Sequence, residues 1–103
     1  MLIIREVMHC KPGKVRPMVE KALQMSKAME KAGQGRMRVL TDVAGERYWT
    51  VTMEFETNSL QDFEAMMSGQ GQNAEAMKEM DGIMKGYHEL VDIGRREIYK
   101  VES

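Results

Sequence analysis

The sequence contains a single cysteine, Cys10, among its 103 residues, so no disulfide can form within the chain. A lone thiol is typical of proteins from a reducing compartment, and we therefore expect a cytoplasmic location. The chain also lacks a surplus of positive charge, because 15 Lys and Arg residues stand against 16 Asp and Glu residues and the formal net charge is −1. Proteins that bind nucleic acid generally carry a basic surface. We therefore expect no nucleic-acid partner.

Long apolar runs are also missing. A helix needs about 20 mainly apolar residues to cross a bilayer, and the apolar stretches here are far shorter. The opening residues, M-L-I-I-R-E, lack the basic region that precedes the apolar part of a signal peptide. We therefore expect no membrane partner and no targeting segment. Repeats and linkers are missing as well, which predicts one domain over residues 1–103.

The sequence does contain one segment of strict alternation, which begins at Tyr48. Successive side chains of a β-strand point to opposite faces, so this pattern predicts a strand within Glu46–Thr57. One predicted face is apolar and consists of Trp49, Val51, Met53 and Phe55. The other predicted face carries a row of hydroxyl groups and a carboxylate, on Tyr48, Thr50, Thr52 and Glu54. That second face suits a surface that is covered but holds water or a ligand.

Three other segments precede this strand. Leu2–His9 is rich in β-branched residues and mixes apolar and ionisable groups on both faces, which predicts a central strand. Lys14–Ala32 has apolar residues at spacings of three and four and is followed by Gly33, which predicts a helix. Arg36–Val43 alternates again and predicts a strand that forms a hairpin with the next one through a short turn at Ala44–Glu46.

The remainder of the chain predicts a broken helix and a last strand. Ser59 with Asp62 three residues later is a capping box, which predicts a helix start. Gly69–Asn73 interrupts the helical spacing, and a second helical segment follows. His88–Val101 predicts a long final strand, in which Gly94 indicates a bulge or a bend.

The resulting order is β-α-β-β-α-β. Right-handed crossovers convert this order into an α+β, ferredoxin-like domain with a four-stranded antiparallel sheet and its helices on one face. The opposite face adds Arg38 and Leu40 to the hydroxyl row. A mixed, partly apolar face is an aggregation risk when it is left in water. We therefore predict a symmetric homodimer that packs sheet against sheet.

The chain resembles the dimeric α/β-barrel superfamily, nearest its antibiotic-biosynthesis-monooxygenase-like and NIPSNAP-like families. The resemblance rests on the first strand running into K-P-G-K (Lys11–Lys14), on W-T-V-T-M-E-F-E (Trp49–Glu56), on the broken second helix and on G-R-R-E-I-Y-K-V (Gly94–Val101). It implies a homodimer with a barrel-like pocket, either between the two sheets or between sheet and helices. Members of the superfamily include cofactor-free oxygenases of quinol-like aromatics, haem-degrading enzymes and isomerases.

The haem-degrading branch resembles this chain only loosely. Glu6 stands where that branch has an Asn, and Trp49 lies within the predicted strand where that branch has its Trp after the strand. The residues around His88 do not follow the pattern of the branch either. We therefore expect no haem and no other cofactor.

Two residues are candidates for catalysis. His88 could act as an acid or a base because histidine titrates near neutral pH, and Glu6 on a covered strand could act as a base. The structural alternatives are a surface or capping role for His88 and an ion pair between Glu6 and one of Arg38, Arg95 and Arg96.

Four residues of the second sheet face are candidates for ligand binding: Arg38, Tyr48, Thr50 and Thr52. A few polar groups on an otherwise apolar wall commonly orient a ligand. The alternative is a polar network between two sheets.

No metal site is predicted. His9 and Cys10 are adjacent on a strand and therefore point to opposite faces. Met77, Met80 and Met84 share a helix face and could in principle bind copper(I), but methionine more often fills irregular gaps in a core.

These observations favour a homodimer that binds a small, largely apolar, aromatic or quinone-like molecule. Where it is catalytic, the reaction is cofactor-free monooxygenation or isomerisation. The alternative is a non-catalytic sensory or stress-related binding module.

Overall fold

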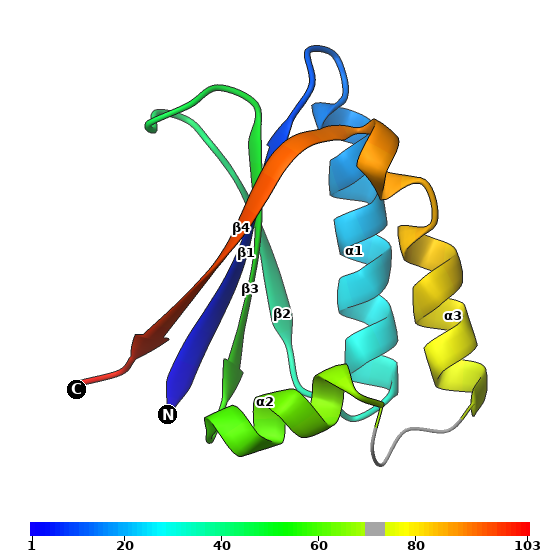
Figure 1. Cartoon of the computed structure of the whole chain (residues 1–103), viewed down its shortest axis with the longest axis vertical. Helices are drawn as coiled ribbons and strands as arrows, with labels where there is room; N and C mark the ends of the chain where they lie inside the picture. The colour runs from blue at the N-terminus through cyan, green and yellow to red at the C-terminus, as the bar shows by residue number, and fades with distance from the viewer. Residues whose placement is uncertain (70–73) are drawn as a thin grey trace.

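The computed structural model describes residues 1–69 and 74–103. The elements follow the predicted order, and the second helical region is divided as predicted. They are β1 (Leu2–Cys10), α1 (Val15–Lys31), β2 (Met37–Thr41), β3 (Thr50–Thr57), α2 (Leu60–Met67), α3 (Ala74–Met84), the 3-10 helix η1 (Tyr87–Glu89) and β4 (Val91–Lys100) (Figure 1). The predicted interruption at Gly69–Asn73 lies outside the described residues from position 70 onward.

The four strands form one open sheet in the order β2-β3-β1-β4, in which every neighbouring pair is antiparallel. Helices α1 and α3 run side by side along one face of the sheet, and α2 crosses its end (Figure 1). This is the predicted ferredoxin-like α+β architecture, with β1 in the predicted central position. Within the described chain the strands have two free edges, at β2 and β4, rather than closing into a barrel.

Alternate side chains of β1 face the helices and the opposite side of the sheet. Ile4 is fully buried against the helices together with Val51 and Met18. The even-numbered side chains of β1, including Glu6, therefore face the helix layer. The odd-numbered side chains, Ile3, Arg5, Val7 and His9, lie on the opposite face, which the sequence pattern alone did not decide.

Helix α1 is held by the apolar stripe that the spacing predicts. Its buried side chains are Met18, Val19, Ala22, Ala28 and Met29. The helix ends at Lys31, and Gly33 follows its C-cap with a φ of 74°, which is easily adopted only by a residue without a Cβ atom. Helix α2 begins at the predicted cap, because the Ser59 hydroxyl accepts a hydrogen bond from the Asp62 backbone N–H at 3.1 Å.

The prediction that β3 includes Tyr48 and Trp49 is wrong. The strand begins at Thr50, and the connection from β2 spans residues 42–49 rather than a short turn. The Trp49 carbonyl still accepts a hydrogen bond from the Cys10 N–H at 2.8 Å, but Trp49 has a φ of 59°. This left-handed conformation ends the alternation, so the indole leaves the helix-facing row and is 46% exposed. Val51, Met53 and Phe55 form the apolar row as predicted.

Strand β4 contains a register shift near the predicted irregularity. His9 pairs with Ile93 and Cys10 pairs with Val91, so Asp92 is the extra residue of a bulge. The shift lies two residues before Gly94. Gly94 has a different role, because a Cβ atom there would lie 2.9 Å from the Met8 sulfur. The glycine lets the Met8 side chain pass close to β4.

Ile4 provides a test of this core. Ile4→Ala is expected to lower the free energy of unfolding by about 2–5 kcal/mol, because it empties a fully buried site. Ile98→Ala is the matched control, since Ile98 pairs with Ile4 across the sheet but is 39% exposed. It should cost about 1 kcal/mol or less. Urea unfolding measures both, and equal losses would contradict the placement of the core.

Candidate functional site

The sheet face away from the helices, which we call the open face, carries a mixture of charged, hydroxyl and apolar side chains. Strand register places on it Arg38 and Leu40 from β2, Thr50, Thr52, Glu54 and Glu56 from β3, Ile3, Arg5, Val7 and His9 from β1, and Ile93, Arg95, Glu97 and Tyr99 from β4. This face is therefore a candidate binding surface.

A buried carboxylate lies at its centre. Glu54 is only 4% exposed, and its two oxygens are held by different arginines. Arg5 Nε donates to Oε1 at 2.7 Å, and Arg38 Nε donates to Oε2 at 3.0 Å. The hydrogen bond from Arg38, followed by that from Arg5, lowers the pKa of Glu54 against the effect of burial. Glu54 therefore joins β1, β2 and β3 as an ionised group.

A second cluster links β1 to β4. The Arg5 guanidinium lies 5.4 Å from the centre of the Tyr99 ring, and the Tyr99 hydroxyl donates to Glu97 Oε1 at 3.2 Å. Arg95 Nε donates to the other Glu97 oxygen at 2.8 Å. The hydrogen bond from Arg95 lowers the pKa of Glu97. Charges on this half of the face are therefore paired as well.

His9 is fixed in one protonation state by its neighbours. A guanidinium nitrogen of Arg95 lies 2.8 Å from Nε2, and because a guanidinium only donates, Nε2 must accept. Nδ1 therefore carries the proton and donates to Thr50 Oγ1 at 3.0 Å. Burial, and then the charges of Arg47 and Arg95, lower the pKa of His9. The open face thus holds a neutral imidazole.

The predicted ligand-binding residues are not all brought together. Arg38 binds Glu54, and Thr50 binds His9 and donates to the Arg47 carbonyl at 3.1 Å. Thr52 lies between them on the open face. Tyr48 lies in the β2–β3 connection, outside the strand, and is 80% exposed. A polar network is therefore present within the single sheet, whereas the network between two sheets that was predicted as the alternative stays a prediction.

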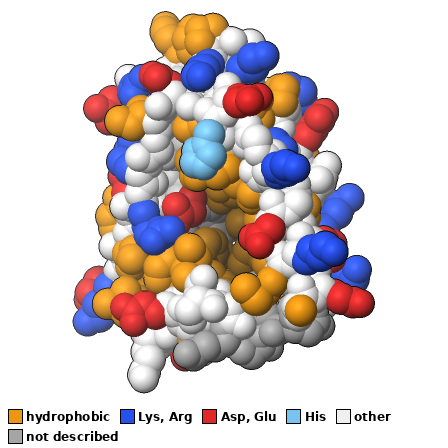
Figure 2. Space-filling model, turned by 45° about the vertical axis from the view of Figure 1, so that its right-hand side comes forward, with side chains coloured by type: hydrophobic (Ala, Val, Ile, Leu, Met, Phe, Trp, Pro, Cys, Tyr) orange, Lys and Arg blue, Asp and Glu red, His pale blue; other side chains and the backbone are white. Residues whose placement is uncertain are grey.

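The predicted catalytic residues lie on the other side of the sheet. Glu6 and His88 both line a cavity of about 340 Å³ between β1, β4 and η1, which we call the helix-side cavity. Figure 2 shows this side of the molecule, where a hollow with hydrophobic side chains lies below a histidine. Met8 and Val91 supply apolar wall, and Gly94 leaves room between the strands.

An ion pair forms one side of the helix-side cavity. Arg96 Nε donates to Glu6 Oε1, one of the pairings predicted for Glu6. The same guanidinium lies 5.0 Å from the centre of the Phe63 ring of α2. Sequence reasoning gave three possible arginines for Glu6, because spacing along one strand does not reveal the residue opposite it.

The turn after α3 is bound by a lysine that the sequence did not single out. Lys21 Nζ of α1 donates to the carbonyls of Ile83 at 3.1 Å and of Lys85 at 2.8 Å. A cation at a helix C-terminus stabilises it. Directly after this end of α3, Tyr87 and His88 place their rings 4.0 Å apart. Lys21 therefore positions the turn that carries His88.

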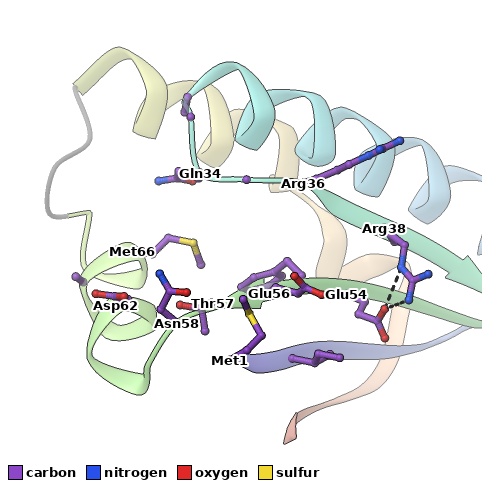
Figure 3. A pocket seen from close by; sticks show the side chains of 16 residues that line it. Met1, Gln34, Arg36, Arg38, Glu54, Glu56, Thr57, Asn58, Asp62 and Met66 are labelled. Atoms are coloured by element: carbon purple, nitrogen blue, oxygen red, sulfur yellow. Dashed lines mark hydrogen bonds and ion pairs between the residues drawn. The ribbon is translucent and has the colours of Figure 1, made fainter. Parts of the chain in front are cut away.

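A larger groove of about 1060 Å³ lies at the far end of β3, which we call the edge groove (Figure 3). It runs between the α1–β2 connection and α2. Arg38 and Glu54 lie at its open-face end, and Arg36, Glu56 and Met66 lie along it. Arg38 is the one predicted ligand-binding residue that lines either hollow.

His9 and Cys10 point to opposite faces as predicted. His9 faces the open face, whereas Cys10 is part of the core, where burial raises the pKa of its thiol. Within residues 1–69 and 74–103, no three His, Cys, Asp or Glu side chains are grouped so as to hold a metal ion. Among the helices of these residues, none combines the length and the apolar character needed to span a bilayer.

Comparison with known proteins places the fold but no family. No protein-family model matches the chain, and none of the curated proteins matches it in sequence. A NIPSNAP-like domain protein from Burkholderia xenovorans superposes with a TM-score of 0.77 at 15% identity, over 99% of this chain and 85% of the other. A NIPSNAP family protein from Agrobacterium tumefaciens gives 0.73 at 13% identity, with 97% and 92% covered.

A candidate antibiotic biosynthesis monooxygenase from Nitrosomonas europaea is also similar, with a TM-score of 0.68 at 11% identity and 100% of both chains covered. The structural resemblance to these two groups, predicted from sequence, is confirmed. At such low identity the similarity extends to the fold alone, so any activity has to be argued from the side chains of this chain.

The neutral state of His9 predicts a pH dependence. In the unfolded chain the imidazole has its ordinary pKa of about 6.5, so below that pH the unfolded chain binds a proton that the folded chain resists. The free energy of unfolding is therefore expected to fall as the pH drops from 7.5 to 5.5. Urea unfolding at a series of pH values measures this. A further loss below pH 4.5 should follow as Glu54 is protonated.

His9→Asn should remove most of the loss between pH 7.5 and 5.5. A wild-type protein that gains stability over this interval would contradict the assignment of a neutral His9.

Proposed function

We propose that the protein binds a small, mainly apolar molecule with an aromatic or quinone-like ring in the helix-side cavity. The observation that carries this proposal is the cavity itself. Its volume of about 340 Å³ lies at the lower end of the range of about 300–1,000 Å³ typical of small-molecule sites. A ring would lie against Met8, whose polarisable thioether makes favourable contacts with aromatic groups.

The polar groups of the cavity would orient such a ring. Arg96 brings a positive charge to the wall and is itself steadied by Glu6 and by the Phe63 ring. A guanidinium in this position would bind a phenol or quinone oxygen. His88 lies at the rim, where its imidazole could take up a proton from a bound phenol or enol. The reaction class supported by this arrangement is cofactor-free monooxygenation or isomerisation.

A non-catalytic binding module is the second candidate, and one observation favours it. The Glu6 carboxylate is already engaged by Arg96, so it is not placed to accept a proton from a ligand. Of the two predicted catalytic residues, only His88 would then be available for proton transfer. The two candidates share the same binding site and differ in whether the bound molecule is turned over.

We also propose that the working form is a homodimer joined through the open face. Ile3, Leu40, Ile93 and Tyr99 give this face apolar surface beside its charges. Because Glu54, Glu97 and their arginines are paired within one chain, covering them would cost less than burying isolated charges. A twofold arrangement would use the same surface on both copies.

Binding can be tested with 1-naphthol and with menadione as probes. In protein that carries labelled methionine methyl groups, either probe is expected to shift the Met8 signal in a saturable manner. Gly94→Leu should abolish the shift, because its side chain would fill the space beside Met8. Gly45→Leu, in the β2–β3 connection, is the matched control and should bind normally. Binding that survives Gly94→Leu would exclude the helix-side cavity.

Turnover separates the two candidates. If the protein is an oxygenase, it should consume dioxygen with a naphthoquinol, and His88→Asn should slow the reaction by about 100-fold while the probe still binds. Binding without dioxygen consumption and without isomerisation of the bound probes would select the non-catalytic module.

A further inference from the structure

The β2–β3 connection ends in an unusual group of exposed apolar side chains. Val43 is fully exposed, and Tyr48 and Trp49 place their rings 5.9 Å apart near the end of the connection. The connection leans away from the helix layer, to the side of the open face (Figure 1). Large apolar side chains that gather on a projecting loop mark a contact surface.

The backbone conformation of the β2–β3 connection keeps these side chains exposed. Trp49 adopts a φ of 59°, which is unfavourable for a residue with a Cβ atom. Two hydrogen bonds nevertheless fix the backbone where the loop meets the sheet. The Asp42 carboxylate accepts a hydrogen bond from the Thr50 N–H at 2.8 Å, and the Trp49 carbonyl accepts one from the Cys10 N–H at 2.8 Å. Strain that the surrounding structure maintains is characteristic of functional positions.

The edge groove provides a hollow at the opposite end of β3, lined by charged side chains such as Arg38 and by the apolar side chains of Phe55 and Met66. It opens beside Ile3, Arg38 and Glu54 of the open face. Glu56 lies seven positions along the chain from Trp49, a span of about 23 Å at about 3.3 Å per residue, so Trp49 cannot reach the far end of the groove of its own chain. One face of the molecule thus has a projection at one end and a hollow at the other.

Twofold symmetry determines how these two features can meet. If the axis of a face-to-face dimer ran along the strands, both loops would lie at the same end and both grooves would stay open. If the axis ran across the strands, the ends would exchange, and each loop would lie over the groove of the other copy. Both surfaces carry charges of both signs, so in this arrangement Glu46 of the loop would be able to face Arg36 of the groove, and Arg47 would be able to face Glu56.

We propose that Tyr48 and Trp49 of one copy enter the edge groove of a second copy, so that each groove is completed by an aromatic pair from its partner. The indole would stack on the Arg38 guanidinium, a favourable cation–π arrangement. The sequence predicted Arg38 and Tyr48 as parts of one site, and within one chain they are apart. In the proposed dimer, Tyr48 of one copy would lie beside Arg38 of the other. This inference rests on the proposed dimer, and it adds that the loop end of one copy meets the groove end of the other.

Trp49 is the only tryptophan of the chain, so its fluorescence reports on the proposed contact. As the wild-type protein is diluted through its dimer dissociation, which sedimentation follows, the emission is expected to shift to longer wavelength and iodide quenching to increase. A dimer whose Trp49 stays accessible to iodide would overturn the inference and leave the proposed dimer standing. A monomer at all concentrations would overturn both.

Trp49→Ala is expected to weaken dimerisation at least about tenfold, since tryptophans at the centre of a contact dominate its affinity. Leu23→Ala is the matched control, because Leu23 is 47% exposed, much like Trp49, but lies on α1. Its dimerisation should be unchanged. Equal dimerisation of Trp49→Ala and wild type would overturn the inference.

The direction of the axis is tested by cross-linking in a Cys10→Ala background with a short bis-maleimide. Val43→Cys combined with Arg36→Cys should give covalent dimers, whereas each single cysteine variant should not. Covalent dimers of the Val43→Cys variant alone would show that the two loops lie at the same end, and would overturn the exchange.

Discussion

The central position of β1 is the constraint on which the rest of the structure depends. The side chains of a central strand lie between those of two neighbouring strands, so its polar groups are partly shielded from water and are stabilised by partners within reach. On the helix side Glu6 meets Arg96, and on the open face Arg5 meets Glu54. Neighbouring residues of one strand thus anchor two separate polar clusters. The sheet is joined across its width by these contacts as well as by its backbone ladder.

The two faces consequently have different properties. On the open face, charge is compensated locally, because Glu54 lies between two arginines and His9 is held neutral. A compensated face loses less on removal from water than one with isolated charges, which makes it suited to contact with another protein. The helix side instead has a gap between β4 and the helices. The proposed ligand site and the proposed dimer contact therefore lie on opposite faces of the sheet.

The fold could be predicted from the sequence because it depends on periodicity. The alternation from Val51 to Phe55 and the apolar spacing of α1 are local patterns, and both predict their burial correctly. Trp49 breaks the pattern for a reason that no local signal contains. Its left-handed conformation depends on loop closure by Asp42 and on the hydrogen bond from Cys10, which is distant in sequence. Alternation continued through Trp49 therefore predicted the wrong side.

The candidate site depended even more on long-range register. The sequence suggested Glu6 and His88 for their chemistry, and the structure places both beside one cavity. Only the pairing of β1 with β4 shows that Arg96 faces Glu6. A bulge at Asp92 changes the register between the two strands, and no residue type in that segment encodes the shift. The partners of the candidate residues therefore followed from the sheet, and their catalytic role stays a prediction.

The methionines connect the core to the cavity. Met8, Met66, Met80 and Met84 are partly buried and pack around the edge of the core, between the sheet and the divided second helix. Unbranched thioether side chains fill irregular spaces and rearrange at low cost. Of these four, Met8 lines the helix-side cavity and Met66 lines the edge groove, so one flexible side chain borders each hollow. The abundance of methionine is therefore best understood as a property of the space between helices and sheet, rather than as a set of metal ligands.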